Sequence, residues 1–183
     1  ALLLLAGLTT GCITIDVGGG PGGKLEETVV SGRKGPKILL LEIDGEITHS
    51  SRSGVLGFMS QESTVSRVRD QLERARQEGD IAAILLRLDS PGGSVTASDL
   101  VYHEISRFKQ EEKLPVLAQL MSTATSGAYY IAMTADEVVA NRTTVTGSIG
   151  VILLGVNFTG LMDKLGIENQ TFTSSSFKDA GSP

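Results

Sequence analysis

Three segments of the chain each follow an apolar run and carry groups that could take part in acyl transfer. Segment 89–94 reads Asp-Ser-Pro-Gly-Gly-Ser, a second segment contains Ser126 followed by Gly127, and a third contains Lys178. A serine hydroxyl attacks a carbonyl carbon when a base removes its proton and backbone amides stabilise the oxyanion that forms. The three segments therefore hold the kinds of group that a serine hydrolase needs.

Each feature taken alone also has an ordinary explanation. Segment 89–94 could be a plain strand-to-helix turn, and Ser126 could be a helix N-cap, since Ser is among the best capping residues. Lys178 could be a solvated loop lysine. The alternative is that the glycines turn backbone amides toward an anion, as in a nucleophile elbow without its usual G-x-S-x-G spelling. The residues alone leave both interpretations open.

The base that Ser126 would need is not an obvious histidine. His49 and His103 both precede Ser126, and no histidine follows His103. A Clp-type Ser/His/Asp triad is therefore poorly supported. The other base available to a serine is a lysine that burial keeps uncharged, which makes Lys178 a candidate.

Hydrophobic periodicity predicts the elements that position these segments. Apolar runs predict strands, and apolar residues at 3–4 spacing predict helices between them. The predicted strands are 38–43, 81–88, 116–120, 137–140, 151–156 and 168–173, and the predicted helices are 63–78, 96–111 and 159–165. This alternation predicts an α/β fold with a mostly parallel sheet, in which functional loops follow the strands.

Four motifs in order resemble those of the signal peptide peptidase A family, in its short bacterial form. They are SPGG at 90–93, SGAYY at 126–130, TGSIGV at 146–151 and FKD at 177–179. The resemblance covers essentially 37–183. It implies a Clp-protease- and crotonase-like spiral of mostly parallel strands with crossover helices.

The family resemblance also implies roles for single residues. Ser126 would be the nucleophile, Lys178 the general base and Ser148 the residue that orients Lys178, while the amides of Gly93 and Gly127 would form the oxyanion hole. The implied substrates are short apolar peptides such as remnant signal peptides. The implied assembly is a homo-oligomeric ring with active sites at subunit interfaces.

Two other functions fit the same fold. A crotonase-type acyl-CoA enzyme would need catalytic carboxylates near the two loops and would give Ser126 and Lys178 no special role. A catalytically inactive envelope scaffold would keep the fold for assembly only. The sequence departs from the family pattern at Ala128, where the family usually has a second glycine.

Composition narrows the classes of partner. The 183 residues carry a net charge of −5, with no Trp and no Lys/Arg cluster, so nucleic acid is not expected as a partner. Cys12 is the single cysteine, and the histidines are far apart in sequence. These features predict an enzyme that uses neither a metal ion nor another cofactor.

The N-terminal part predicts a membrane attachment. Residues 1–12 look like the remnant of a signal peptide or anchor, and Leu-Thr-Thr-Gly-Cys at 8–12 resembles a lipobox that would place a lipid on Cys12. Residues 13–36, rich in Gly and Pro, predict a flexible tether, and 37–183 predict a peptidase domain that is incomplete at its C-terminus. The expected location is the bacterial cell envelope, with the catalytic domain outside the cytoplasm.

Overall fold

The computed structural model describes residues 11–16, 26–32, 35–53, 60–61, 63–175 and 177–179. It divides into two units, residues 1–149 and 150–183, and each is described by itself. The strands are β1 (Gly11–Asp16), β2 (Glu26–Ser31), β3 (Lys37–Ile47), β4 (Arg52–Ser53), β5 (Ser60–Gln61), β6 (Ile81–Gly93), β7 (Val116–Thr125), β8 (Glu137–Ala140) and β9 (Val145–Gly147). The helices are α1 (Thr64–Glu78), α2 (Val95–Glu112), α3 (Gly127–Ala132) and α4 (Thr159–Lys164).

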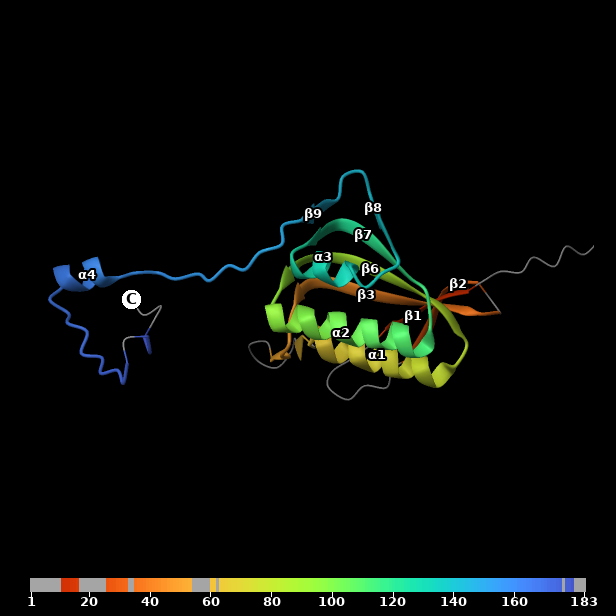
Figure 1. Ribbon diagram of the computed structural model, residues 1–183, viewed down its shortest axis with the longest axis horizontal. Coiled ribbons are helices and arrows are strands. Elements are labelled where there is room, and N and C mark those ends of the chain that lie inside the picture. The colour runs from red at the N-terminus through yellow and green to blue at the C-terminus, as the bar shows by residue number, and fades with distance from the viewer. Residues whose placement is uncertain are drawn as a thin grey trace, which may run out of the picture. The chain divides into compact units, whose positions relative to one another are not determined.

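The first unit is built on one seven-stranded sheet in the order β2-β1-β3-β6-β7-β8, with β9 also paired to β7 (Figure 1). Among the described strands of this sheet, β1, β3, β6, β7, β8 and β9 run parallel to one another, and β2 runs antiparallel to β1. Parallel neighbours need crossover connections, which α1 and α2 supply. The predicted α/β class with a mostly parallel sheet is confirmed.

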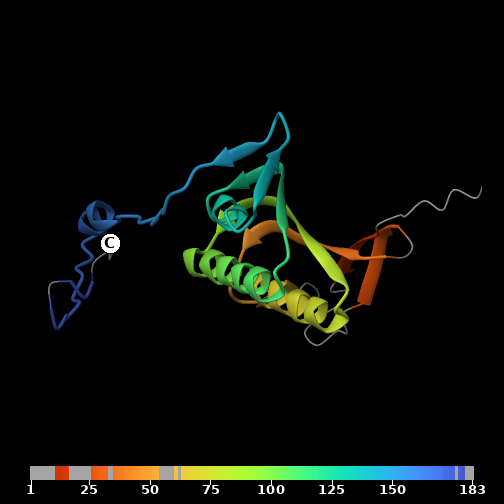
Figure 2. The same ribbon diagram turned by 45° about the vertical axis from the view of Figure 1, so that its right-hand side comes forward.

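Helices α1 and α2 lie side by side on one face of the sheet (Figures 1 and 2). Burial alternates along β6, where Ile84, Leu86 and Leu88 are buried between half-exposed neighbours. Residues from the other elements that share this core include Leu39, Leu41 and Ile43 of β3, Val68 and Leu72 of α1, Val101, Ile105 and Phe108 of α2, Val116, Ala118 and Leu120 of β7, and Ala128, Ile131 and Ala132 of α3. Burial of this apolar face stabilises the sheet–helix layer.

Local signals fix where the two long helices begin and end. The Ser63 hydroxyl accepts from the Ser66 amide at 3.3 Å, and the Ser94 hydroxyl accepts from the Ala97 amide at 3.4 Å, so both residues are N-caps. Helix α1 ends at Gly79 in the left-handed conformation, with φ of 70°. The α2 N-cap at Ser94 places this helix directly after the Gly92–Gly93 turn.

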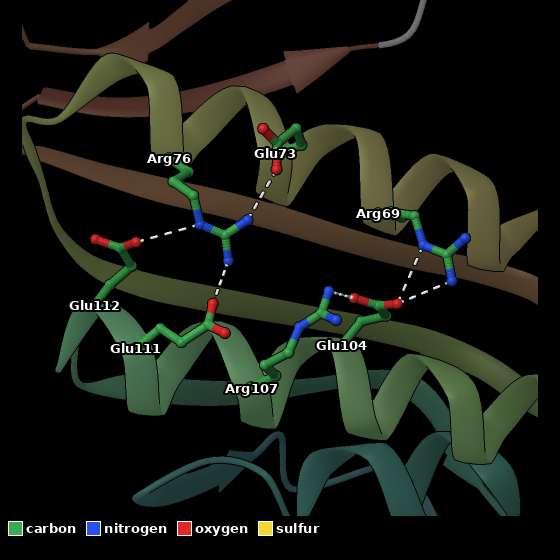
Figure 3. A network of polar contacts seen from close by, with 7 residues as sticks. All are labelled: Arg69, Glu73, Arg76, Glu104, Arg107, Glu111 and Glu112. Carbon is green, nitrogen blue, oxygen red and sulfur yellow. Dashed lines mark hydrogen bonds and ion pairs between the residues drawn. The ribbon is translucent and has the colours of Figure 1, made fainter.

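A network of charged side chains joins the outer surfaces of α1 and α2 (Figure 3). Arg76 is paired with Glu73 of its own helix and with Glu111 and Glu112 of α2, and its guanidinium lies 5.4 Å from the centroid of the Phe108 ring. Arg69 donates to Glu104 at 2.9 and 3.1 Å. These contacts hold the two helices in register and help to fix the position of α2.

Strand β7 is longer than predicted, and it delivers the chain to Ser126. One edge of β7 is covered first by β8, which pairs with residues 117–120, and then by β9, which pairs with residues 123–125. The Thr144 hydroxyl bridges the step between them by donating to the Met121 carbonyl at 2.7 Å. The strand therefore stays ordered up to the turn.

Two further regions differ from the sequence interpretation. Residues 13–36 were expected to be a tether, but β1 and β2 occupy parts of them, and β1 pairs with β3 from Gly11↔Lys37 onward. The β-branched residues of Cys-Ile-Thr-Ile and Thr-Val-Val favour strands, which explains this pairing. The strands predicted at 151–156 and 168–173 are wrong, because the described residues of the second unit offer them no partner strand.

Among the helices that the structure describes, none has both the length and the hydrophobicity that crossing a membrane requires.

Candidate active site

Ser126 occupies a strained turn between β7 and α3. Its φ and ψ are 53° and −119°, a conformation that residues with a side chain rarely adopt. Ser126 holds the N-cap position, but within the described residues its hydroxyl makes no capping hydrogen bond. An ordinary Ser N-cap has extended backbone angles and an engaged hydroxyl. The geometry therefore favours a nucleophile elbow over a simple cap.

Glycines on two elements make room for this turn. A Cβ on Gly92 would lie 2.9 Å from the Ser126 Cβ and 2.8 Å from the Gly127 amide nitrogen. A Cβ on Gly127 would lie 2.1 Å from the Ser98 hydroxyl oxygen of α2. All three distances are shorter than real Cβ contacts, so neither position can carry a side chain without a shift. The 92–93 turn and the 126–127 turn are thus brought into direct contact.

Gly92 and Gly93, which the sequence placed in a turn after residue 88, are the last residues of β6, where they pair with Glu46 and Ile47 of β3 and are fixed by further hydrogen bonds. The Gly92 amide donates to the fully buried Ser90 hydroxyl at 3.0 Å, and the Ser94 amide donates to the Ile47 carbonyl at 3.0 Å. A Cβ on Gly93 would lie 2.2 Å from the Ile47 carbonyl oxygen, so one side of Gly93 is packed against β3. Gly93 is nevertheless exposed to solvent. The role of the Gly93 amide in an oxyanion hole stays a prediction.

The 146–148 segment also meets Ser126. The Ser126 amide donates to the Gly147 carbonyl at 2.8 Å, and the Thr146 hydroxyl donates to the Ala124 carbonyl at 2.9 Å. Gly147 and Ser148 both have positive φ, 81° and 52°. The residue before Ser148 is therefore in contact with Ser126, and the predicted role of Ser148 in orienting Lys178 stays a prediction.

Asp89 lies next to the two loops, but its carboxylate has a structural partner. Its Oδ1 atom accepts from the Thr123 amide at 3.0 Å, which ties β6 to β7 where both strands approach the site. A crotonase-type enzyme would use a carboxylate near these loops on its substrate. The bond to Thr123 gives Asp89 a structural role instead.

The other predicted residues lie apart from this cluster or in the second unit. Lys178 is exposed within the turn residues of the second unit, where its amide donates to the Ser175 carbonyl at 3.2 Å. Cys12 lies in β1, paired with Ile38. His103 is exposed on α2, with its Nε2 atom 3.6 Å from Asp99. The base and the lipidation site therefore stay predictions.

Metal ligands do not gather in the part of the chain that the structure describes: no group of three or more His, Cys, Asp or Glu side chains there could hold an ion. The candidate site consists of a hydroxyl and backbone amides.

Sequence reasoning missed three residues that shape the site. Gly92, rather than Gly93, is the glycine that touches Ser126, and Ser98 is the side chain against Gly127. Ser90 holds the turn from inside the core. Positions 92 and 90 lie within the SPGG motif and could have been inferred from it. Ser98 carries no signal in the sequence, because its contact depends on how α2 packs against α3.

The fold and the site define an α/β protein whose parallel sheet presents a serine at a strained strand-to-helix turn, with glycines from a second turn against it. The sequence model of Peptidase family S49 matches residues 108–183, which include Ser126, Ser148 and Lys178. The chain belongs to peptidase family S49.

Individual relatives agree with this assignment. A protein of Enterococcus faecium named as a signal peptide peptidase SppA is 34% identical over 158 residues, which are 86% of this chain and 45% of that protein. A Synechocystis protein named as a protease is 34% identical over 143 residues, 78% of this chain and 46% of that protein. The chain thus spans less than half the length of these relatives.

Solved structures resemble the chain as well. One is a lysine-to-alanine mutant of the 1510-N membrane-bound stomatin-specific protease in complex with a substrate peptide. It is 25% identical, with a TM-score of 0.49, and the match covers 67% of this chain and 49% of that one.

Proposed function

We propose that this chain carries the nucleophile and oxyanion hole of a serine endopeptidase that cleaves short apolar peptides through an acyl-enzyme. The observation that carries the proposal is the Ser126 turn, whose strained backbone is in contact with the Gly92–Gly93 turn. Membership in peptidase family S49 favours peptide bonds as the substrate over the acyl-CoA thioesters of a crotonase-type enzyme. The same membership favours an active enzyme over an inactive scaffold, since Ser126 and Lys178 are both present.

The proposed reaction has two half-reactions. The uncharged amine of Lys178 takes the proton from the Ser126 hydroxyl, and the Ser126 Oγ bonds to the peptide carbonyl carbon. The amides of Gly93 and Gly127 stabilise the oxyanion, while the Lys178 ammonium protonates the leaving amine as the C–N bond breaks. Water then attacks the acyl-enzyme, with Lys178 as base again, and releases the acid and Ser126.

Each residue has a specific requirement in this scheme. Lys178 must reach Ser126 in an environment that keeps its amine uncharged, and Ser148 would orient that amine by a hydrogen bond. The position of Gly147 against the Ser126 amide supports this placement of Ser148. Losing one oxyanion donor typically lowers the rate about 10²–10³-fold.

The proposed setting is a bacterial cell envelope, with the domain outside the cytoplasm and attached to the membrane through the N-terminal part, either by an anchor or by a lipid on Cys12. The substrates would be remnant signal peptides, bound by a homo-oligomeric ring whose active sites lie at subunit interfaces. The name of the Enterococcus relative and the family resemblance support the substrate class.

The test is cleavage of a fluorogenic apolar peptide across pH by the full-length protein and by Ser126→Ala and Lys178→Ala. Both variants should lose activity, and the wild-type rate should rise through a single basic limb as the lysine loses its proton. Thr173→Ala serves as a matched control in the segment that contains Lys178. Substantial activity in Lys178→Ala would show that another group is the base.

A further inference from the structure

Helix α3, which begins directly after Ser126, is too short to fix its own orientation. It has six residues, Gly127–Ala132. A helix of this length is not stable alone, because the free-energy cost of nucleation exceeds what the hydrogen bonds of one or two turns contribute. The first hydrogen bond of the helix joins the Tyr130 amide to the Ser126 carbonyl at 2.9 Å. Tyr130 thus lies one turn after the proposed nucleophile, and whatever holds Tyr130 also holds Ser126.

Tyr130 is held by two residues of α2. Its hydroxyl donates to the Asp99 Oδ1 at 2.9 Å, and its ring stacks on Tyr102 with centroids 4.7 Å apart and planes at 28°. The hydrogen bond to the Asp99 carboxylate raises the pKa of Tyr130, so the phenol stays a donor at neutral pH. The imidazole of His103 also approaches Asp99, at 3.6 Å.

These contacts connect the two halves of the proposed oxyanion hole. Gly93 is the last residue of β6, one residue before the Ser94 N-cap of α2, and Gly127 is the first residue of α3, so each of the two amides lies at or near the start of one of these helices. The Ser98 side chain of α2 already touches Gly127. Ala128, Ile131 and Ala132 anchor α3 in the core. The Tyr130–Asp99 bond adds a directional contact to α2 one turn after Ser126.

We infer that Tyr130, through its hydroxyl bond to Asp99, is a positioning residue that sets the separation of the Gly93 and Gly127 amides and the direction of the Ser126 hydroxyl. The inference rests on the proposed function. Tyr130 contacts neither substrate nor reacting atoms in this scheme. Its contribution is to the geometry of the transition state, so kcat depends on it and KM does not.

The test compares Tyr130→Phe with wild-type full-length protein. The variant removes one oxygen and keeps the stacking on Tyr102. We expect kcat for a fluorogenic apolar peptide to fall about tenfold with KM within about twofold, a smaller loss than removal of an oxyanion donor. The rate at which a fluorophosphonate labels Ser126 should fall by the same factor. Tyr129→Phe is the matched control, because the Tyr129 hydroxyl bonds to no other residue that the structure describes.

Substitutions at Asp99 separate positioning from general stabilisation. Asp99→Asn keeps an oxygen that can accept from Tyr130 and should restore kcat to near the wild-type value, whereas Asp99→Val should reproduce the loss. The double variant of Tyr130→Phe and Asp99→Val should lose no more than either single variant. Each of these outcomes supports the inference.

Other results overturn it, and they are distinct from failure of the proposed function. A wild-type kcat and labelling rate in Tyr130→Phe, with Ser126→Ala inactive, would show that the bond only adds stability. Equal losses in Asp99→Asn and Asp99→Val would exclude the acceptor role of Asp99. Activity that survives Ser126→Ala would instead remove the proposed function itself.

Discussion

At the scale of single residues, the main feature is the strained backbone of Ser126, which the surrounding residues hold in place. A residue with φ of 53° and ψ of −119° pays on the order of 1–3 kcal/mol relative to relaxed backbone. Such strain persists only where the surroundings determine the conformation, and here the Gly147 carbonyl accepts from the Ser126 amide. Strain of this kind is typical of sites where the exposed side chain serves the chemistry.

Replacing Ser126 with glycine should therefore stabilise the fold while it abolishes activity. Glycine adopts this backbone conformation without strain, and part of that gain is offset by its larger entropy in the unfolded chain. We expect Ser126→Gly to exceed Ser126→Ala in free energy of unfolding by about 1 kcal/mol, measured by urea denaturation. Ser126→Ala is the matched control, because alanine carries the same backbone strain. A glycine variant less stable than the alanine variant would contradict the strain argument.

Much of this site could be predicted from residue types and order, and the rest could not. The Ser126–Gly127 turn and the glycines after Pro91 are short local motifs, so their residue types alone predict a role in the candidate site. The contact between Gly92 and Ser126 depends on β6 and β7 ending at the same edge of the sheet. The Asp99–Tyr130 bond depends on how two helices pack. Neither long-range contact leaves a local signal in the sequence.

At the scale of elements, an ion pair ties α2 to the segment before β8. It lies at the start of β7, at the opposite end of that strand from Ser126. The Lys109 Nζ atom of α2 lies 2.6 Å from the Asp136 Oδ1 and donates to the Thr134 carbonyl at 3.0 Å. Asp136 Oδ2 accepts from the Val116 amide at 2.8 Å, where β7 begins. The hydrogen bond from Lys109, and then that from Val116, lower the pKa of Asp136 below its ordinary 3.8.

The lowered pKa of Asp136 predicts a pH-dependent contribution to stability. A carboxylate whose pKa is depressed by folding stabilises the fold above its unfolded pKa, and this contribution is lost as the pH falls through the folded value. Asp136→Asn keeps the acceptor for Val116 but removes the charge, so its midpoint of thermal unfolding should lie below wild type at pH 7. The gap should close as the pH falls below about 3.8.

Glu137→Gln is the control for this prediction, since the Glu137 side chain pairs with no other described residue. It should track the wild-type midpoint at every pH. A gap between Asp136→Asn and wild type that stays constant down to pH 3 would mean that the charge of Asp136 contributes nothing, and that the variant acts through packing alone.

Element boundaries show where sequence reasoning holds and where it fails. Helices α1 and α2 begin and end near the predicted residues, because caps such as Ser63 and Gly79 are local. The β1–β2 pair was missed because the Gly-rich run between its strands is also typical of a tether. The segment 151–156 is rich in β-branched and apolar residues, but a strand forms only when a partner strand is present.

At the scale of the whole molecule, the second unit exposes an unusual amount of apolar side chain. The residues Val151, Leu153, Leu154, Phe172 and Phe177 are between 78% and 97% exposed. Helix α4 has no buried residue. Leaving many large apolar side chains in water is unfavourable, so their number favours contact with a further protein surface. The proposed assembly of several subunits would supply such a surface.

If the ring places the Ser126 of one subunit against the Lys178 of its neighbour, two inactive variants should complement each other. Ser126→Ala retains the lysine and Lys178→Ala retains the serine, so randomly mixed rings should recover about a quarter of wild-type sites. Peptidase activity after mixing and reassembly measures this recovery. Mixing either variant with the double variant should give none, because one partner of every site is then missing. Two variants that stay inactive in mixed rings would place both residues of the dyad in one subunit.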